Sequence, residues 1–436
     1  MIAISLVAVL LVAGVGIYLV TSDDSEEPMK IDSELSVYGN ANNDYTIDSK
    51  DLSIIDKIIA GECKLSEYPL ADANKDGKVT SADKDIVNKV IKDESADLVI
   101  IDQLGREVSV KYPLDNVIAV RSDVSTFMAC AGFDEHVYGF TGTSDYKFMY
   151  EGIKKAGGTH ISKGSSVDAE LWQKIVQADS ELYTKGESIG AIVVDRVGSF
   201  GDFADDMEQA GIPGIGIRVT DPDLVLSGTL LMGFLFGPEA YGDCKAYVAE
   251  CEKAMNYLDE KLDKLTEDEK IPFISVISYR CVSGDESQYT KLGIAAGGIP
   301  MTKIKGDTSP QLQSVEAITE YDELIEQILA FRTIGCYNLE PAEYWEYKTM
   351  PYVEKSAWYE DMVLINCSMP VTCRVLYAAS VLYPELISED YADSVFQKIV
   401  DEHMTYLNDT QEDGHFDVSK DMTTTMTYQD YLDSKK

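Results

Sequence analysis

Hydrophobic and polar positions change their period several times along the chain, and each change predicts a different kind of element. Residues 1–20 are apolar and carry no charged side chain, which is enough for one membrane-spanning helix. Between residues 36 and 95, apolar positions recur at helical spacing in two short stretches. From residue 97 onward, apolar runs of strand length alternate with helical stretches, which predicts an α/β fold with mostly parallel sheets.

The α/β part is predicted to begin with a hairpin over residues 98–110, whose turn lies near Gln103–Gly105. The further predicted strands are 117–120, 137–140, 192–195, 214–219, 273–277 and 362–365, and the predicted helices are 124–131, 168–177 and 371–382. Residues 297–300 are predicted to form a turn, and residues 321–331 fit either a strand or a helix.

One long helix interrupts this alternation. It is predicted to start at Pro238, directly after Gly237, because proline is well tolerated in the first turn of a helix. Its apolar residues recur in steps of three and four, at Tyr241, Cys244, Val248, Cys251, Met255, Leu258, Leu262 and Leu265. Such a helix spans roughly 40 Å, which is too long for an ordinary crossover between strands. We interpret residues 238–268 as a bridge between two lobes, 97–237 and 269–436, with a coiled coil as the alternative.

The apolar N-terminal segment, residues 1–21, is predicted to be a membrane anchor. A cleavable signal peptide is the alternative, but no basic residue precedes the apolar run and no clear A-x-A cleavage pattern follows it. Residues 22–35 begin with the acidic stretch Ser22–Glu27 and are predicted to be a linker. We therefore expect an extracytoplasmic protein that an uncleaved helix holds at the membrane.

Composition narrows the choice of partners. The chain of 436 residues has 76 acidic and 37 basic residues, so its net charge of −39 repels nucleic acid and suits cations. Its eight cysteines form no C-x-x-C pair, which argues against a zinc site built on close pairs. Disulfides remain open, and buried free thiols are the interpretation that we favour. The length is sufficient for two or three domains.

Two twelve-residue stretches, here called loop one (residues 40–51) and loop two (residues 72–83), repeat one pattern of oxygen-bearing side chains. Oxygens fall at loop positions 1, 3, 5, 9 and 12, and position 7 offers its backbone carbonyl, so the ligands surround one point as Ca²⁺ requires. The predicted ligands are Asn40, Asn42, Asp44, Thr46, Asp48 and Asp51 in loop one, and Asp72, Asn74, Asp76, Lys78, Thr80 and Asp83 in loop two. Two Asx-rich turns are the alternative, which the repetition in register disfavours.

Each loop leads into a short amphipathic helix, and we expect the two apolar faces to pack against each other. The faces are formed by Leu52, Ile55, Ile58 and Ile59 after loop one, and by Ile86, Val87, Val90 and Ile91 after loop two. A segment this small has little core of its own, so bound metal would supply much of its folding energy.

Two such loops in register, each with aspartate at position 12, resemble a dockerin module, a small all-α module related to the EF-hand. The resemblance covers about residues 36–95 and implies two bound Ca²⁺ ions and a cohesin domain as a partner. Loop one departs from the family pattern, because Asn40 replaces the usual aspartate and Tyr45 replaces the glycine of the sharp turn. We therefore expect loop two to bind Ca²⁺ more strongly than loop one.

Four short motifs beyond residue 97 point to a second family. They are Asp102–Val108 (D-x-x-G-R-E-V), Ala131–Gly139, Ala296–Pro300 and Leu382–Leu386. In this order, and with the long helix between them, they resemble the helix-bridged substrate-binding proteins of ABC importers for iron siderophores, haem and cobalamin. The resemblance runs from about residue 97 to the C-terminus. It implies a metal chelate bound between two lobes, an ABC permease as partner and no enzymatic activity.

Candidate chelate ligands lie at predicted strand ends, because ligands of open α/β sheets bind beyond the carboxyl ends of the strands. Arg121 ends the first strand of the first lobe, and Tyr279 and Arg280 end that of the second. A guanidinium pairs well with carboxylate, catecholate or phosphate oxygens, and a solvated charge is the alternative. Tyr146 and Trp172 are further candidates whose flat rings suit a planar ligand, with core packing as the alternative.

Two glutamates are candidates for contact with a permease. The resemblance implies one glutamate on each lobe, at the start of a helix, that pairs with permease arginines, and Glu170 and Glu316 match those places. Such carboxylates also stabilise the N-terminus of a helix, and this is the alternative role.

Enzyme motifs are lacking in the sequence. It contains no G-x-S-x-G, no P-loop and no dinucleotide fingerprint, and its four histidines show no metal-binding spacing. A metal-dependent enzyme on a similar bilobal fold therefore has little support. The stronger alternative to ligand capture is a cell-surface attachment protein that uses the dockerin-like module and keeps the lobes as a scaffold.

Overall fold

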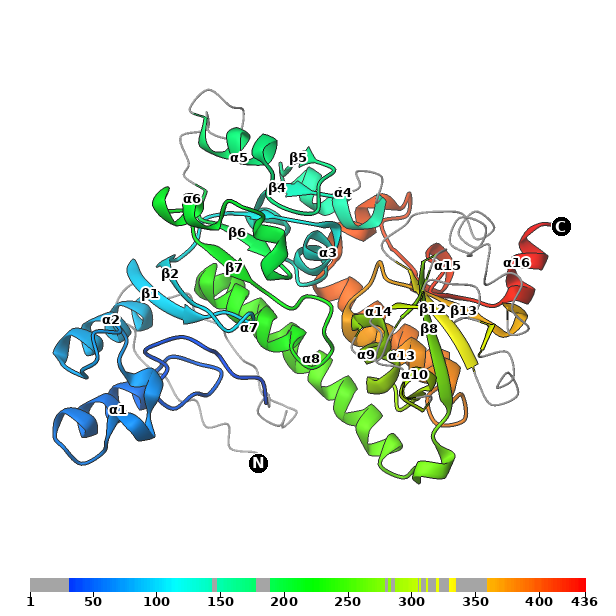
Figure 1. Ribbon diagram of the computed structural model, residues 1–436, viewed down its shortest axis with the longest axis horizontal. Coiled ribbons are helices and arrows are strands. Elements are labelled where there is room, and N and C mark those ends of the chain that lie inside the picture. The colour runs from blue at the N-terminus through cyan, green and yellow to red at the C-terminus, as the bar shows by residue number, and fades with distance from the viewer. Residues whose placement is uncertain are drawn as a thin grey trace, which may run out of the picture. The chain divides into compact units, whose positions relative to one another are not determined.

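The computed structural model describes residues 31–142, 147–177, 189–278, 281–283, 287–304, 306, 311–312, 319–320, 329–334 and 359–436. Figure 1 traces the elements in chain order, from blue to red. The predicted anchor, residues 1–21, lies outside the described residues. Among the helices that are described, none is long and apolar enough to cross a membrane.

The first described module carries two helices, α1 (Ser49–Ile59) and α2 (Ser81–Ile91), each directly after one of the two loops. Both helices begin in a capping box, with Asp48 and Thr80 as the N-caps, so the end of each loop also starts its helix. As predicted, the two helices contact each other. They enclose a small core of Ala41, Ile55, Ala71, Ala73 and Val87.

The packing of these helices differs from the prediction at one position in each. Ile59 and Ile91 are 47% and 43% exposed, although the sequence places both on the apolar faces. Each is the last residue of its helix, and the two occupy equivalent positions in the repeat. The helices are too short for the small core to reach their last residues.

A hairpin of β1 (Ala96–Ile101) and β2 (Glu107–Tyr112) follows the module, and its antiparallel pairing confirms the prediction. Gly105 lies in its turn with a φ of +77°, a conformation that residues with a side chain rarely adopt.

Residues 31–37, here called the strap, lie along this hairpin. Ile31, Leu35 and Val37 are buried, and Val37 forms an antiparallel bridge with Ile100. Residues 31–35 of the predicted linker are therefore packed against the lobe.

The N-terminal lobe contains a five-stranded parallel sheet of order β5-β4-β3-β6-β7. Its strands are β3 (Val117–Ala119), β4 (Val137–Thr141), β5 (Thr159–Ser162), β6 (Ala191–Val194) and β7 (Gly214–Gly216). Its helices are α3 (Ser122–Cys130), α4 (Lys147–Lys155), α5 (Ala169–Val176), α6 (Ala204–Gln209) and α7 (Val225–Leu235).

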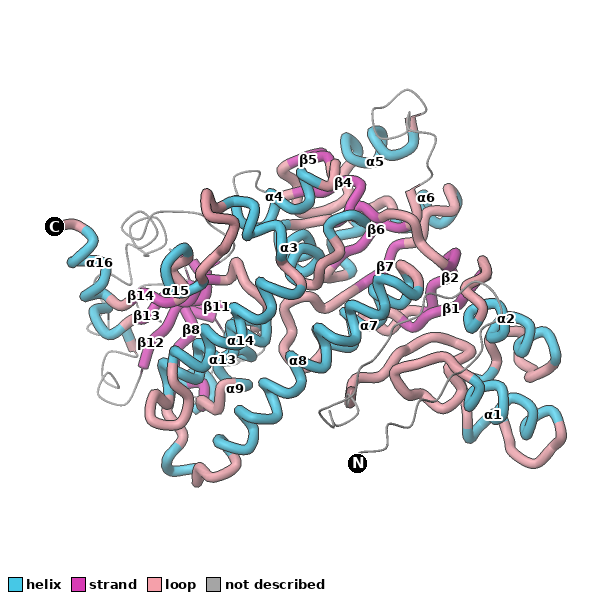
Figure 2. Tube along the Cα trace, turned by 180° about the vertical axis from the view of Figure 1, so that it is seen from behind, coloured by secondary structure: helices cyan, strands magenta, loops and turns pink. Residues whose placement is uncertain are grey.

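Alternate strand residues of this sheet enter two different apolar clusters. Ala119 and Val193 belong to the main core with α3 and α7, whereas Ile118 and Ile192 pack in a second cluster with Trp172 of α5. Helices therefore cover both faces of the sheet (Figure 2), which suits its nearly continuous apolar strands.

The long helix α8 (Pro238–Leu262) packs against α7 and then against α13 (Val371–Leu382). Its predicted apolar stripe is buried at Tyr241, Cys244, Val248, Cys251 and Leu258. The helix is shorter than the predicted 238–268, because it ends at Leu262, and Leu265 lies beyond it. The stripe packs within this chain, so the coiled-coil alternative is not needed. The preceding helix α7 was not predicted, because nine of its eleven residues are buried and no polar face gives it a helical period.

The C-terminal lobe contains a seven-stranded mixed sheet of order β11-β9-β8-β12-β13-β14, with β10 beside β8. The strands are β8 (Pro272–Ser278), β9 (Cys281–Ser283), β10 (Ile299–Pro300), β11 (Gln311–Leu312), β12 (Leu329–Ile334), β13 (Val363–Asn366) and β14 (Thr425–Met426). The central strands β8, β12 and β13 are parallel, and β9, β11 and β14 are antiparallel to their neighbours. Because β10 is also parallel to β8, the prediction of mostly parallel sheets holds for β8, β10, β12 and β13 and fails for β9, β11 and β14.

The further described helices of this lobe are α9 (Gln288–Ala295), α10 (Met301–Ile304), α14 (Glu389–Glu402), α15 (Val418–Asp421) and α16 (Tyr428–Ser434). The predicted helix 371–382 coincides with α13, whereas the predicted turn at residues 297–300 contains the short strand β10. Cys244, Cys251 and Cys373 are buried free thiols, as favoured above.

Candidate functional site

Loop two folds around its own side chains. The Asp72 carboxylate accepts the backbone N–H groups of Asp76 at 3.1 Å and Gly77 at 2.8 Å. Asp83, at position 12, accepts from Asn74 at 3.2 Å and from Thr80 at 2.7 Å. Gly77 has a φ of +87°, which lets the chain turn sharply at position 6. These hydrogen bonds close the loop on itself, as in known calcium-binding loops, with the predicted ligands distributed along it.

Loop one closes on itself in the same way, but its side chain at position 1, Asn40, makes different hydrogen bonds. The side-chain amide of Asn40 donates to the carbonyl oxygens of Leu35 and Asp44, each at 2.7 Å. These two acceptors fix the orientation of the amide, because the opposite orientation would place oxygen against oxygen. The Oδ1 atom of Asn40 is fully buried and has no hydrogen-bond partner within the described structure. A cation at the centre of the loop would supply that missing partner.

A lysine lies beside the carboxylates of loop one. The Nζ atom of Lys50 is 3.3 Å from Asp44 and 3.5 Å from Asp48, and both carboxylates raise the pKa of the ammonium. Burial raises the pKa of Asp51, although hydrogen bonds from the backbone of Asp48 and Asn42 oppose this. Loop two has Ala82 at the position of Lys50, so this nearby positive charge is specific to loop one.

The ligand sets of both loops mix several oxygen types. Within the described residues, no three histidine, cysteine, aspartate or glutamate side chains gather at one point as a metal site. In both loops, aspartate carboxylates accept hydrogen bonds from backbone N–H groups of the same loop. The fit to Ca²⁺ rests on the loop geometry and on the buried Asn40 oxygen.

A second candidate site begins where β3 ends in the N-terminal lobe. Arg121 has a φ of +90° and a ψ of +152°, a conformation that costs a residue with a side chain conformational energy. Its backbone N–H donates to the hydroxyl of Thr141, at the end of β4, at 3.0 Å. Backbone strain of this kind occurs often at ligand sites, which makes this strand end a functional candidate.

The Arg121 side chain is held by two carboxylates. Its Nη1 atom is 2.7 Å from Asp195, which follows β6, and its Nη2 atom is 2.5 Å from Asp123, in the first turn of α3. Arg196 also pairs with Asp195, at 2.9 Å, and this hydrogen bond raises the pKa of Arg196 although burial opposes it. The four side chains, here called the strand-end cluster, carry two positive and two negative charges.

Sequence reasoning found Arg121 but missed the other members of the strand-end cluster. Asp195 ends a predicted strand and Arg196 directly follows it, so the rule that selected Arg121 applies to both. The pairing of Asp195 with Arg121 depends on β3 and β6 being neighbours, which the order of strands in the sequence does not reveal.

Polar groups of the N-terminal lobe also contact α9, in the C-terminal lobe. Lys291 pairs with Asp221 at 2.6 Å, and the hydroxyl of Thr220 donates to the side-chain oxygen of Gln288 at 2.7 Å. Burial raises the pKa of the Tyr289 phenol in the same helix, and the charge of Asp123 adds to the shift. Polar groups from both lobes therefore meet at the start of α9.

The remaining predicted site residues are spread over the chain. Trp172 is 7% exposed and stacks on Phe203 at 6.0 Å, so its ring belongs to the second apolar cluster of the N-terminal lobe. Glu170 lies in the first turn of α5 with a 72% exposed side chain and pairs with Lys174 at 2.8 Å. The other four predicted residues lie outside the described residues or have no described side chain: Tyr146, Tyr279, Arg280 and Glu316.

Comparison with known proteins supports both resemblances at the level of fold. Residues 38–92 match the family model of the dockerin type I domain. No curated protein matches the chain.

Solved structures of periplasmic binding proteins share the fold of the lobes. A periplasmic solute-binding protein from Veillonella parvula matches with 14% identity and a TM-score of 0.51, covering 75% of this chain and 98% of its own. The TroA-like periplasmic binding protein FepB of the same organism matches with 15% identity and a TM-score of 0.51, covering 70% and 96%. The molybdate-bound protein MolA of Haemophilus influenzae matches with 13% identity and a TM-score of 0.50, covering 70% and 97%. The part of the chain that follows the dockerin match at residues 38–92 thus has the fold of periplasmic solute-binding proteins.

Proposed function

We propose that this chain is the extracytoplasmic substrate-binding protein of an ABC importer, which holds one metal chelate between its lobes and delivers it to a permease. The observation that carries the proposal is the strand-end cluster around the strained Arg121, in a lobe whose polar groups also contact α9 of the other lobe. The chelates in question are iron siderophores, haem and cobalamin. Capture and release break no covalent bond, so the role is not enzymatic.

The strand-end cluster would recognise anionic oxygens of the chelate. Arg121 and Arg196 share the Asp195 carboxylate, so their positive charges are already compensated. An anionic oxygen of the ligand would take the place of one carboxylate in a charge-assisted hydrogen bond. Arg280, Tyr279 and Tyr146 are the residues we propose to complete the site.

A ligand panel tests this function. We would titrate the full chain with ferric siderophores, haem, cobalamin, molybdate and free metal ions and follow tryptophan fluorescence. The expected result is one saturable ligand with one-to-one stoichiometry. A folded protein that binds nothing in the panel would contradict the proposal.

For delivery, we propose that Glu170 and Glu316 pair with arginines of the permease. The exposed Glu170 carboxylate at the start of α5 is suited to such a contact. Reversing both charges, with Glu170→Lys and Glu316→Lys, should reduce uptake of the chelate and leave its binding unchanged. Intact uptake would show that these carboxylates only cap their helices.

We further propose that the dockerin domain binds two Ca²⁺ ions, one in each loop, and that residues 1–21 anchor the chain in the cell membrane. Support for calcium comes from the two loop geometries and the buried Asn40 oxygen. Calcium titration of the full chain should show two binding steps, the stronger one in loop two. Cell fractionation tests the anchor, and recovery of the chain in the soluble extracellular fraction would contradict it.

A second candidate function is attachment to a cell-surface scaffold through a cohesin domain, and the dockerin match at residues 38–92 favours it. The two functions use separate parts of the chain and are compatible. Calcium-dependent capture on an immobilised cohesin domain, with no ligand found in the panel, would make attachment the main role. No capture in either calcium or chelator would remove this candidate.

A further inference from the structure

The two loops differ in how they contact the rest of the chain. Bonds that loop one makes outside itself reach the strap and α8. Loop two contacts the hairpin of the lobe through Lys75, whose Nζ atom lies 2.7 Å from Glu107 of β2. The same Nζ atom lies 2.9 Å from the hydroxyl of Tyr38, directly after the strap. Lys75 occupies position 4, which supplies no calcium ligand.

A hydroxyl of the bridging helix holds one peptide unit of loop one. Tyr241 of α8 donates a hydrogen bond to the carbonyl oxygen of Tyr45. The N–H of the same peptide unit, that of Thr46, donates to Oδ1 of Asp44 at 2.8 Å. Burial raises the pKa of Tyr241, so its hydroxyl keeps the proton that it donates. One rigid peptide plane thus connects α8 with a predicted calcium ligand.

The strap makes a second connection to loop one. The N–H of Leu35 donates to the carbonyl of Asp44 at 3.2 Å, and the Asn40 amide donates to the carbonyl of Leu35. Asn40 and Asp44 are the predicted ligands at positions 1 and 5. A change in the position of either ligand therefore moves a group that is hydrogen-bonded to Leu35 of the strap.

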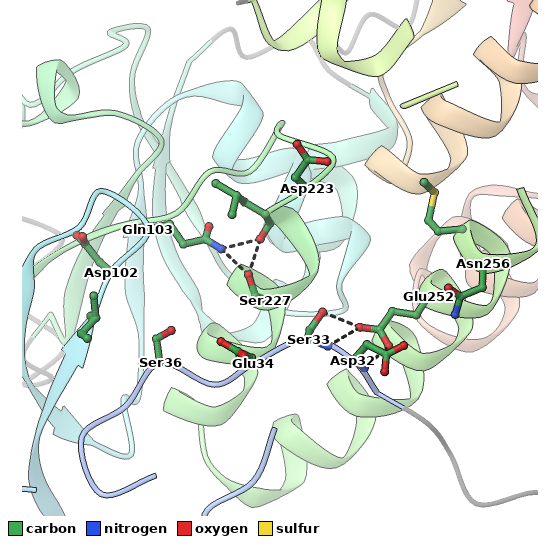
Figure 3. A pocket seen from close by; sticks show the side chains of 13 residues that line it. Asp32, Ser33, Glu34, Ser36, Asp102, Gln103, Asp223, Ser227, Glu252 and Asn256 are labelled. Carbon is green, nitrogen blue, oxygen red and sulfur yellow. Dashed lines mark hydrogen bonds between the residues drawn. The ribbon is translucent and has the colours of Figure 1, made fainter. Parts of the chain in front are cut away.

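The strap is in turn fixed to the lobe. Glu252 of α8 accepts the N–H groups of Asp32 at 2.7 Å and Ser33 at 2.8 Å, and its carboxylate is also bonded to the Ser33 hydroxyl. Figure 3 shows these bonds where the strap crosses α8, at the edge of a cavity of about 540 Å³. On the other side, Ile101 of β1 donates to Ser36 of the strap, and Tyr38, directly after the strap, donates to Val99 of β1, each at 2.9 Å.

We propose that loop one is a calcium-operated joint: Ca²⁺ in loop one and the docking of the strap on α8 and β1 stabilise each other, whereas Ca²⁺ in loop two leaves the strap unaffected. This inference rests on the proposed calcium binding. An ion that draws the oxygens of Asn40 and Asp44 together also fixes the groups that bond Leu35 and Tyr241. Coupling of this kind is reciprocal, so loss of the Tyr241 bond weakens calcium binding in loop one.

Calcium titration calorimetry on the full chain tests the coupling. Tyr241→Phe removes only the hydroxyl, and we expect it to weaken the loop-one binding step roughly two- to tenfold while the loop-two step is unchanged. Lys75→Met is the matched variant, because it removes the lobe contact next to loop two without touching a ligand side chain. It should leave both steps unchanged.

Hydrogen exchange of the strap gives a readout that needs no variant at the joint. In the wild type, CaCl₂ should slow exchange at residues 32–37 severalfold relative to chelator. Asp48→Ala removes a predicted ligand that does not contact the strap, and should abolish this slowing, whereas Asp72→Ala in loop two should preserve it.

The outcomes separate the joint from calcium binding itself. If Ca²⁺ binds in two steps but Tyr241→Phe leaves both unchanged and strap exchange is insensitive to Ca²⁺, the joint is wrong and calcium binding stands. If the wild type shows no calcium-binding step, both proposals fail together.

Discussion

Loop one and loop two are two copies of one sequence pattern that the fold uses differently. Both have a positive φ at position 4, +55° at Asn43 and +58° at Lys75, and both end in a capping box that starts a helix. Seven of their twelve positions differ, among them positions 1, 6 and 11, where loop one has Asn40, Tyr45 and Lys50.

These differences link the ligand residues of loop one to neighbouring segments, whereas those of loop two bond within their own loop. Loop two keeps the aspartate and the glycine that make it a self-contained ring, with Asp72 bonded to two amides of its own loop. Loop one has an amide at position 1, whose donors reach Leu35 as well as Asp44, and a tyrosine at position 6, whose carbonyl receives the Tyr241 hydroxyl. A repeated motif can thus keep its backbone geometry while one copy becomes part of the contact with a neighbouring domain.

The largest expected effect is the loss of a position-1 ligand. Asp72→Ala should weaken calcium binding in loop two roughly 10- to 100-fold, because it removes a charged ligand and two hydrogen bonds from amides. Asn40→Ala should have a smaller effect on loop one, since the residue carries no charge. Titration calorimetry measures both, and equal losses would contradict the difference between the loops.

Asn40→Asp tests whether Asn40 only makes loop one a weak calcium site or also holds the strap in place. An aspartate would bring loop one closer to the family pattern, yet it removes two buried donors and places a carboxylate against two carbonyl oxygens. Without calcium, we expect the free energy of opening the strap to fall by about 1–3 kcal/mol, measured by hydrogen exchange. Asn74→Asp in loop two is the control and should leave the strap unchanged. If Asn40→Asp left hydrogen exchange of the strap unchanged, the proposed link between Asn40 and the strap would be wrong.

Gly77→Ala probes the sharp turn of loop two. An added Cβ meets open space, but the φ of +87° is unfavourable for alanine by about 1 kcal/mol. Calcium affinity of loop two should therefore fall about fivefold. Lys78→Ala, at the next position, should have little effect, because only the backbone carbonyl is a predicted ligand there. An unchanged affinity after Gly77→Ala would show that the turn is not what strengthens loop two.

The smallest expected effect concerns the lysine beside loop one. Lys50→Ala removes a positive charge 3.3 Å from Asp44, so calcium affinity of loop one should rise roughly two- to fivefold at low salt. The reciprocal variant Ala82→Lys should weaken loop two by a similar factor. Both effects should shrink as ionic strength rises, and effects that are independent of salt would exclude competition between charges.

Elements with a clear period were predictable from the sequence. The hairpin β1–β2, the stripe of α8 and the helix α13 follow from local patterns of apolar residues. Helix α7 was not predictable in this way, because an element buried on all sides has no polar face. The exposure of Ile59 and Ile91 depends on where the small core ends, which periodicity does not report.

Candidate ligands were predictable as residue types at strand ends and loop positions, but their partners were not. The carboxylates that neutralise Arg121 come from α3 and from the end of β6, and they meet only because β3 and β6 are adjacent. The strap resembles a polar linker in the sequence because its buried residues, Ile31, Leu35 and Val37, are few and widely spaced. Contacts between distant segments depend on the tertiary fold, which a single sequence does not encode in a local pattern.

The most direct test of the proposed capture function is isothermal titration of the chelate selected by the panel into the full chain, with the wild type next to Arg121→Ala. We predict one-to-one binding by the wild type and at least roughly tenfold weaker binding by the variant, because its charge-assisted contact to the ligand is lost. Affinities that agree within error, with both proteins folded, would contradict a ligand site at the strand-end cluster. The absence of any titrating chelate would contradict the capture function itself.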